Sequence, residues 1–369
     1  MHGPTPDVAV IGAGIIGTSI AWRLAQAGCR VTILDAGVVG GEASWAGAGM
    51  LAPGGEIEHR SAWSDFALES LGLYPAFVTE LQDESGCAID FQRQGAVELA
   101  FTETEWEQLA SRADAQRELG IASERLDAAG VRALAPLVEC AADCKIAAAL
   151  FFPGDAIVDP RHVTSALATA CRRRGVEIHE HRRVSALRPR GSTVEIETGA
   201  SSLTAARAVL AAGAWSSGID VRVPIPASFP VKGHLLGYRL EPGSLRTIVR
   251  HAETYVLQRA NGFTIAGSSV ERVGFDRRID RSIVDDIHRR ACSVLPCLAC
   301  PPAPDPWIGF RPATEALEPE IRRVADTGLW LAYGHYRNGI LLAPATAALL
   351  SREIIASLGT GSTSRGGSQ

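Results

Sequence analysis

Three glycines near the start of the chain, Gly12, Gly14 and Gly17, form a Gly-x-Gly-x-x-Gly motif between an apolar, β-prone run and a stretch of helical spacing. Gly12 permits a tight turn, Gly14 lets the backbone approach a pyrophosphate, and Gly17 lets the helix lie close to the strand. The N-terminus of the helix favours the negative charge of that pyrophosphate. Asp35, at the end of the next β-prone run, is placed to accept hydrogen bonds from ribose hydroxyls. The motif predicts a dinucleotide cofactor, either NAD or FAD.

Two further segments rich in small residues could contact a flavin ring. In the first, residues 41–53, Ala46 to Gly49 would let the backbone lie flat against the ring and offer N–H groups to its N5 and O4 edge. In the second, residues 334–344, Gly339 to Leu341 open the last predicted helix, so their free N–H groups would face the N1 and O2 edge, where charge accumulates on reduction. Tight turns between core elements are the alternative interpretation of both segments.

Both segments resemble the D-amino-acid oxidase superfamily, and most closely its glycine oxidases of the thiamin-biosynthesis type. The resemblance in motif order extends over essentially the whole chain. It implies FAD rather than NAD as the cofactor. Neither segment contains a cysteine, so the covalent flavin linkage of monomeric sarcosine oxidases is not expected. We therefore expect non-covalent FAD.

The resemblance also assigns the adenine end of the cofactor. Val184, expected in a strand, would contact adenine through its backbone, and residues 212–216 resemble the second dinucleotide-contact segment. Together, the predicted cofactor-binding residues are Gly12, Gly14, Ile15, Ile16, Gly17, Asp35, Ala36, Ser44, Ala46, Gly47, Ala48, Gly49, Met50, Val184, Ala212, Gly213, Trp215, Arg311, Arg337, Asn338, Gly339, Ile340 and Leu341.

The substrate site of such an enzyme must bind a carboxylate. Residues 309–314 resemble the family segment that supplies the clamping arginine, so Arg311 is the first candidate, because a planar guanidinium donates two parallel bonds to a carboxylate. Tyr255 matches the position whose hydroxyl adds a further bond, although the residues after it depart from the usual Val-Pro-Arg. Arg337 is expected near the flavin edge and the substrate entrance. A structural salt bridge is the alternative role for either arginine.

Other polar residues suggest different chemistry, which we reject. Cys292, Cys297 and Cys300 copy the spacing of three iron–sulfur ligands, but the first lies in a predicted helix and a matching fourth ligand is missing. His234 and His335 stand without a metal set or a nucleophile, and such histidines more often pack or hydrogen-bond. We therefore expect no metal site and no histidine base.

Composition limits the class of partner. The 369 residues carry a net charge of −5, which argues against nucleic acid and an anionic membrane as partners, and 46% are hydrophobic, enough for a sizeable core. The eight cysteines are scattered without a disulfide-like framework, which suggests reduced thiols in the cytoplasm. No basic stretch precedes the first apolar run, so we expect no signal peptide. The expected protein is soluble, cytoplasmic and homo-oligomeric.

The predicted elements describe an α/β protein with an α+β substrate part. Helices are expected over 64–81, 104–119, 127–134, 161–174, 283–295 and 340–355, a hairpin over 89–101, and strands near 8–11, 31–34, 176–178, 184–187, 194–196, 208–212, 235–240, 247–251, 255–258, 264–266 and 329–332. The resemblance implies a glutathione-reductase-like Rossmann FAD domain built from residues 1–80, 150–225 and 300–369. A mainly β substrate domain, residues 81–149 and 226–299, is inserted into it. The polar tail, 359–369, should be flexible.

These expectations converge on oxidation of glycine, or of small amines and D-amino acids such as sarcosine and D-Ala. The imine or 2-oxo acid would form while O2 is reduced to H2O2, and the imine could serve a thiazole synthase. One alternative keeps the flavin but passes electrons to an acceptor other than O2. Another is an NAD-dependent or non-catalytic dinucleotide binder.

Overall fold

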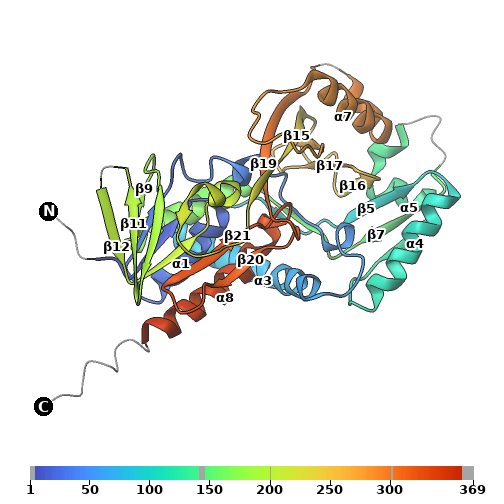
Figure 1. Cartoon of the computed structure of the whole chain (residues 1–369). Coiled ribbons are helices and arrows are strands. Elements are labelled where there is room, and N and C mark those ends of the chain that lie inside the picture. The colour runs from blue at the N-terminus through green and yellow to red at the C-terminus, as the bar shows by residue number, and fades with distance from the viewer. Residues whose placement is uncertain (1–4, 141–145, 200, 301, 360–369) are drawn as a thin grey trace, which may run out of the picture.

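A computed structural model describes residues 5–140, 146–199, 201–300 and 302–359. Within these residues the strands form four sheets, of six, eight, four and three strands. Figure 1 shows the two larger sheets in two lobes, with α1 and β21 in the left lobe and β5, β7 and α7 in the right lobe. The predicted tail beyond Gly359, and Cys144, lie outside the described residues.

The six-stranded sheet is built around the N-terminal βαβ unit. β1 (Val8–Ile11) and β2 (Val31–Leu34) are parallel neighbours joined by α1 (Ile15–Gln26), and every residue of both strands is buried. Strands this apolar require cover on both faces of the sheet. The order across the sheet is β20, β21, β13, β1, β2, β9, where the other strands are β20 (Glu320–Arg323), β21 (Leu329–Tyr333), β13 (Arg207–Leu210) and β9 (Glu177–His179).

Helices α3 (Ala62–Ser85), α6 (Pro160–Arg173) and α8 (Gly339–Gly359) pack with α1 around this sheet. A capping box between the Ser61 and Ser64 side chains starts α3, and left-handed Gly86 ends it. By length and composition α8 could cross a membrane, but most of it is buried against α1 and α3. Its apolar character is therefore that of a core helix.

The eight-stranded sheet forms the wall of the second lobe. Its order is β19 (Asp305–Ala313), β15 (Phe229–Arg239), β18 (Phe263–Gly267), β17 (Thr254–Gln258), β16 (Ile248–His251), β5 (Ala96–Ala100), β7 (Ala148–Phe152) and β6 (Glu124–Leu126). Three helices accompany it: α7 (Arg281–Val294), α4 (Glu103–Arg117) and α5 (Ala128–Leu134). The predicted helices and most predicted strands are confirmed to within a few residues.

Two smaller sheets complete the fold. β10 (Ala186–Arg190) and β11 (Thr193–Thr198), close to two of the predicted strands, form an antiparallel pair that is extended by β12 (Ser201–Ala205) and β14 (Asp220–Val221). β3 (Met50–Leu51), β8 (Ala156–Val158) and β4 (Phe91–Gln92) form the other. Val184, predicted to lie in a strand, is in the loop before β10.

The predicted hairpin over 89–101 is wrong. β4 pairs with β8, whereas β5 pairs with β7 and runs parallel to β16, so the two strands belong to different sheets. Alternation along a chain shows that a segment is extended but does not identify its partner. β19 was not predicted as a strand, and it belongs to the eight-stranded sheet although residues 300–369 were predicted for the FAD domain. The domain boundaries themselves stay a prediction.

Candidate active site

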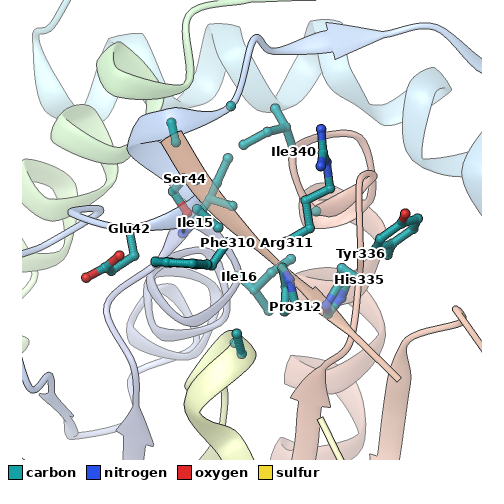
Figure 2. Close-up of a pocket in the computed structure, with 18 of the residues that line it drawn as sticks. Ile15, Ile16, Glu42, Ser44, Phe310, Arg311, Pro312, His335, Tyr336 and Ile340 are labelled. Carbon is teal, nitrogen blue, oxygen red and sulfur yellow. Dashed lines mark hydrogen bonds between the residues drawn. The ribbon is translucent and has the colours of Figure 1, made fainter. Parts of the chain in front are cut away.

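A cavity of about 780 Å³ runs between the two lobes. The start of α1, the segment after β2 and the loop before α8 line it from one lobe, and β15, β17 and β19 line it from the other. In Figure 2, Ile15, Ile16 and Ser44 lie on one side of the β19 ribbon, and His335, Tyr336 and Ile340 on the other. A cavity of this size can hold a cofactor or another small ligand.

The glycines of the N-terminal motif have distinct spatial roles. Gly12 has a φ of +109°, and a Cβ there would stand 2.3 Å from the Ala211 carbonyl oxygen. A Cβ on Gly17 would stand 2.0 Å from the Gly12 carbonyl oxygen, so both positions are closed by protein backbone. At Gly14 a Cβ would meet only the Ser44 hydroxyl, at 3.2 Å. Gly14 therefore leaves its space to the cavity, where a pyrophosphate would fit beside the start of α1.

Two side chains, Asp35 and Ser44, are fixed by hydrogen bonds at the end of the cavity next to the start of α1. Asp35, at the carboxyl end of β2, accepts hydrogen bonds from the Ala13 N–H (2.6 Å) and the Gly37 N–H (2.7 Å), which fix its carboxylate. The Ser44 hydroxyl accepts a bond from the Ile15 N–H at 2.9 Å and so satisfies one free donor of α1. These contacts orient the groups that a dinucleotide would meet.

The first small-residue segment is held firmly from outside the cavity. Gly49 has a φ of +83°, and a Cβ there would stand 2.0 Å from the Val158 carbonyl oxygen. Buried Arg259 donates to that same carbonyl oxygen at 2.5 Å and to the carbonyl oxygen of Ala48. The indole N–H of Trp307, on β19, donates to the Ala46 carbonyl oxygen at 3.0 Å. The segment is thereby fixed as part of the cavity wall.

The second segment begins α8 at the cavity. Carbonyl oxygens of the first helical turn accept bonds from α3: Ile340 from the Tyr74 hydroxyl at 2.7 Å, and Leu341 from the Ser70 hydroxyl at 2.6 Å. Tyr336 has a φ of +49°, and its N–H donates to the Pro312 carbonyl oxygen at 2.7 Å. The start of α8 therefore faces the cavity with the positive end of its dipole.

Most predicted cofactor residues line this cavity, but two do not. Gly17 packs against the backbone of Gly12, and Leu341 is 2% exposed in the core. Both support the wall rather than form its surface. Val184 and Trp215 line the cavity.

Arg311 reaches the cavity from β19. Its guanidinium donates to the Ser269 carbonyl oxygen (3.0 Å), the Lys232 carbonyl oxygen (3.3 Å) and the Ser268 hydroxyl (2.9 Å). Withdrawal from water lowers the pKa of Arg311, although a guanidinium stays charged in proteins. No carboxylate is hydrogen-bonded to it among the described residues, so a cation is held in place with neutral partners only.

Tyr255 lies on the same wall, next to Arg311. Its hydroxyl lies over Gly267 of β18, where a Cβ would stand 2.5 Å away. Burial raises the pKa of Tyr255, and the nearby cations of Arg311 and Arg337 oppose that shift only in part. The neutral phenol can therefore donate a hydrogen bond to an anion bound at Arg311.

Arg337 stands at the edge of the cavity, with 43% of its side chain exposed, and its Nε lies 3.4 Å from Glu56 Oε1. Glu56, Trp307, Arg259 and Ser268 were not predicted to take part in the site. Glu56 directly follows the first small-residue segment and a Gly-Gly pair, a position that could have singled it out. The roles of Trp307 and Arg259 depend on contacts far along the chain and had no local signal.

His234 and His335 are both buried, and their ring nitrogens make hydrogen bonds within the protein. Both ring nitrogens of buried His234 are engaged: Nδ1 lies 2.8 Å from Glu271 Oε1, and Nε2 accepts from the Asp280 N–H at 3.0 Å. Burial lowers the pKa of His335 to about 3, and its Nε2 lies 3.2 Å from the Thr346 hydroxyl. Neither environment is that of a proton acceptor for a substrate. Half-buried Cys292 lies in α7 with its Sγ 3.7 Å from His288.

Comparison with known proteins finds relatives along nearly the whole chain. The model of the family described as FAD dependent oxidoreductase matches residues 7–353. Glycine oxidase of Geobacillus kaustophilus is 32% identical over 348 residues, which cover 94% of this chain and 92% of that protein. The bifunctional protein ThiO/ThiG of Synechocystis sp. is 32% identical over 360 residues, which cover 95% of this chain and 52% of that protein.

The fold is shared as well. The crystal structure of glycine oxidase from Geobacillus kaustophilus matches with a TM-score of 0.90 at 30% identity, covering 96% of this chain and 95% of that one. The chain therefore shares its mixed α/β fold with that solved glycine oxidase.

Proposed function

The chain belongs to the FAD dependent oxidoreductase family, and from this premise we propose that it oxidises glycine, and less readily sarcosine and small D-amino acids, with O2 as the electron acceptor. The 2-oxo product of glycine would be glyoxylate, formed with ammonia after hydrolysis of the imine. The relatives named as glycine oxidases support this choice of substrate.

One observation carries the proposal: Arg311 and Tyr255 line the same cavity as the segment that contains Ala46, which packs against β19 beside Gly309 and Trp307. Arg311 would clamp the carboxylate through two parallel charge-assisted bonds, and the Tyr255 hydroxyl would add a third. The substrate Cα would then point toward the small-residue segment rather than into solvent. Alignment and removal of water at this position supply most of the rate enhancement that we expect.

We propose that FAD occupies the rest of the cavity. We propose that the pyrophosphate lies at Gly14 and the start of α1, the ribose at Asp35 and the adenine at Val184. The flavin ring would lie between residues 46–50 and the start of α8. When bound, FAD supplies the two-electron acceptor for the reaction and the route from O2 to hydrogen peroxide. The cavity wall would contribute N–H groups and a helix dipole at the ring edges.

The lobes take separate tasks in this proposal. The lobe of the six-stranded sheet would be the glutathione-reductase-like Rossmann FAD domain, discontinuous in sequence, and the eight-stranded sheet the inserted substrate domain. We further propose a cytoplasmic enzyme whose imine product serves thiamin thiazole synthesis, on the strength of its likeness to ThiO/ThiG. The homo-oligomer stays a prediction.

A substrate panel tests the proposal. Purified protein with FAD is mixed under air with glycine, sarcosine, D-Ala and D-Phe, and peroxide is measured, then the panel is repeated with an artificial electron acceptor. We expect glycine to give peroxide and to react faster than D-Phe. Turnover of D-Phe without glycine would remove the proposed substrate, and turnover only with the artificial acceptor would indicate a dehydrogenase.

A further inference from the structure

An amino acid enters a site as a zwitterion, and its ammonium cannot assist loss of hydride from Cα until the nitrogen lone pair is free. The proton must therefore leave the nitrogen near the moment of reaction. Four acidic residues line the cavity: Asp35, Glu42, Glu56 and Glu253. These carboxylates are the anionic groups in the described wall to which the proton could pass.

Three of the four are engaged elsewhere or exposed. Asp35 accepts two backbone bonds at the end of β2. Glu42 lies 2.6 Å from the guanidinium of Arg277. Glu253 is exposed in the turn between β16 and β17. Within the described residues, none of these three carboxylates is hydrogen-bonded to Arg311.

Glu56 differs from them. Its side chain is 23% exposed, and the contact recorded for its carboxylate within the described residues is the one to Arg337, at 3.4 Å. At that distance the two side chains form an ion pair, and the Glu56 carboxylate can still accept a hydrogen bond from another donor. Glu56 lines the same cavity as Arg311 and Tyr255, the residues of the proposed carboxylate clamp, and as its ion-pair partner Arg337. It is a carboxylate beside the substrate position with hydrogen-bonding capacity to spare.

The backbone around Glu56 is held in place. Buried Gln116, on α4, donates through Nε2 to the carbonyl oxygens of Gly54 (2.9 Å) and Ile57 (2.6 Å), which flank Glu56. The Ile57 N–H closes the turn by donating to the Pro53 carbonyl oxygen at 3.0 Å. The carboxylate is therefore presented from a fixed turn, as a group that must meet a small substrate requires.

The charged groups around Glu56 come from several elements. They are Arg337 before α8, Arg250 on β16, Arg311 on β19 and Arg112 on α4, with Tyr255 on β17. The four cations favour the carboxylate, but withdrawal from water outweighs them, and the pKa of Glu56 lies above its ordinary value. Burial thus makes this carboxylate a stronger proton acceptor than an ordinary glutamate.

We propose that Glu56 is the proton acceptor for the ammonium group of a substrate whose carboxylate is bound by Arg311. One N–H bond of the ammonium breaks, its electron pair stays on nitrogen, and the proton forms the O–H bond of the Glu56 carboxylic acid. The neutral amine then assists hydride loss from Cα, and the proton returns to solvent past exposed Arg337. The assignment rests on the proposed oxidation of an amino acid.

The test uses Glu56→Gln in the FAD-loaded enzyme, with anaerobic flavin reduction by glycine followed from pH 6 to pH 10. The amide cannot accept the proton, so only glycine that arrives as the free amine reacts. We expect the second-order reduction rate to fall by roughly two to three decades at pH 7, and to rise about tenfold per pH unit until it meets the wild-type rate near the amine pKa. Glu58→Gln, the same change on an exposed residue of the same loop, should match wild type at every pH.

Two further measurements keep the assignment falsifiable. Acetate has the carboxylate but no amine, so its affinity, read from the flavin absorption spectrum, should be unchanged in Glu56→Gln. Glu56→Asp, which keeps a carboxylate, should restore part of the rate at pH 7. A loss of rate that is equal at every pH, or weakened acetate binding, would show a structural role and overturn the proposal. Failure of the proposed function would be seen separately, as a wild-type flavin that glycine does not reduce.

Discussion

Arg311 lies directly over Gly233 of the neighbouring strand: a Cβ at Gly233 would stand 2.4 Å from Arg311 Nη1 and 2.7 Å from its Cζ. A side chain at residue 233 and the guanidinium cannot share this space. Gly233 therefore sets the height of the guanidinium above the sheet. This dependence crosses two strands, β15 and β19, and involves a residue without any polar side chain.

Gly233→Ala should displace the guanidinium of Arg311 while leaving the cofactor in place. Because a misplaced clamp spoils alignment, we expect kcat/KM for glycine to fall about 10- to 100-fold. Steady-state kinetics with FAD content measured in parallel would check this. Gly72→Ala, at an α3 position where a Cβ meets nothing within 4 Å, is the matched control. Unchanged kinetics in Gly233→Ala would mean that Arg311 is not positioned by this contact.

Arg311→Ala tests the clamp itself. Loss of a buried bidentate ion pair costs about 3 to 5 kcal/mol, so KM for glycine should rise by roughly two to four decades with FAD still bound. Arg311→Lys should recover only part of the loss, because an ammonium has no planar fork. Amines without a carboxylate should be oxidised almost as in wild type. Equal loss of glycine and amine oxidation would make Arg311 structural and transfer the candidacy to Arg337.

Gly14→Val tests the cofactor position. The side chain would occupy space that the protein leaves open beside Ser44, where the pyrophosphate is proposed to lie. We expect a folded protein purified without flavin, as judged by visible absorption together with the circular dichroism spectrum. Normal flavin occupancy in this variant would contradict the assignment of the motif.

The acid dependence of stability should include a contribution from His335. Its pKa is lowered by burial to about 3, against 6.5 for the free side chain. The unfolded chain therefore binds a proton that the folded protein excludes between these values, so stability is lost as pH falls from about 6.5 toward 3. Urea unfolding at pH 7 and pH 4.5 should show a smaller difference in His335→Gln than in wild type. An identical difference in both proteins would refute the burial effect.

The parts of the fold that follow from local sequence could be predicted, and those that depend on distant pairing could not. The βαβ unit at Gly12 is specified within one short stretch by glycine spacing and apolar periodicity. β19 was missed because Pro306 and Pro312 break its pattern, although edge strands tolerate proline. Similarly, the resemblance singled out Arg311 as a candidate, but its contact with Gly233 depends on the register of two strands distant in sequence.

The hydrogen bonds of Arg259 limit how the two lobes can move relative to each other. Its buried guanidinium, at the end of β17, donates to carbonyl oxygens of Ala48 and Val158, which belong to segments far away along the chain. Swinging the lobes apart as rigid bodies would break both bonds, at a cost of about 1.5 to 3 kcal/mol for each bond. Hinge opening is thus disfavoured. We therefore expect small substrates to enter by local movement of side chains at the exposed edge of the cavity, where Arg337 stands.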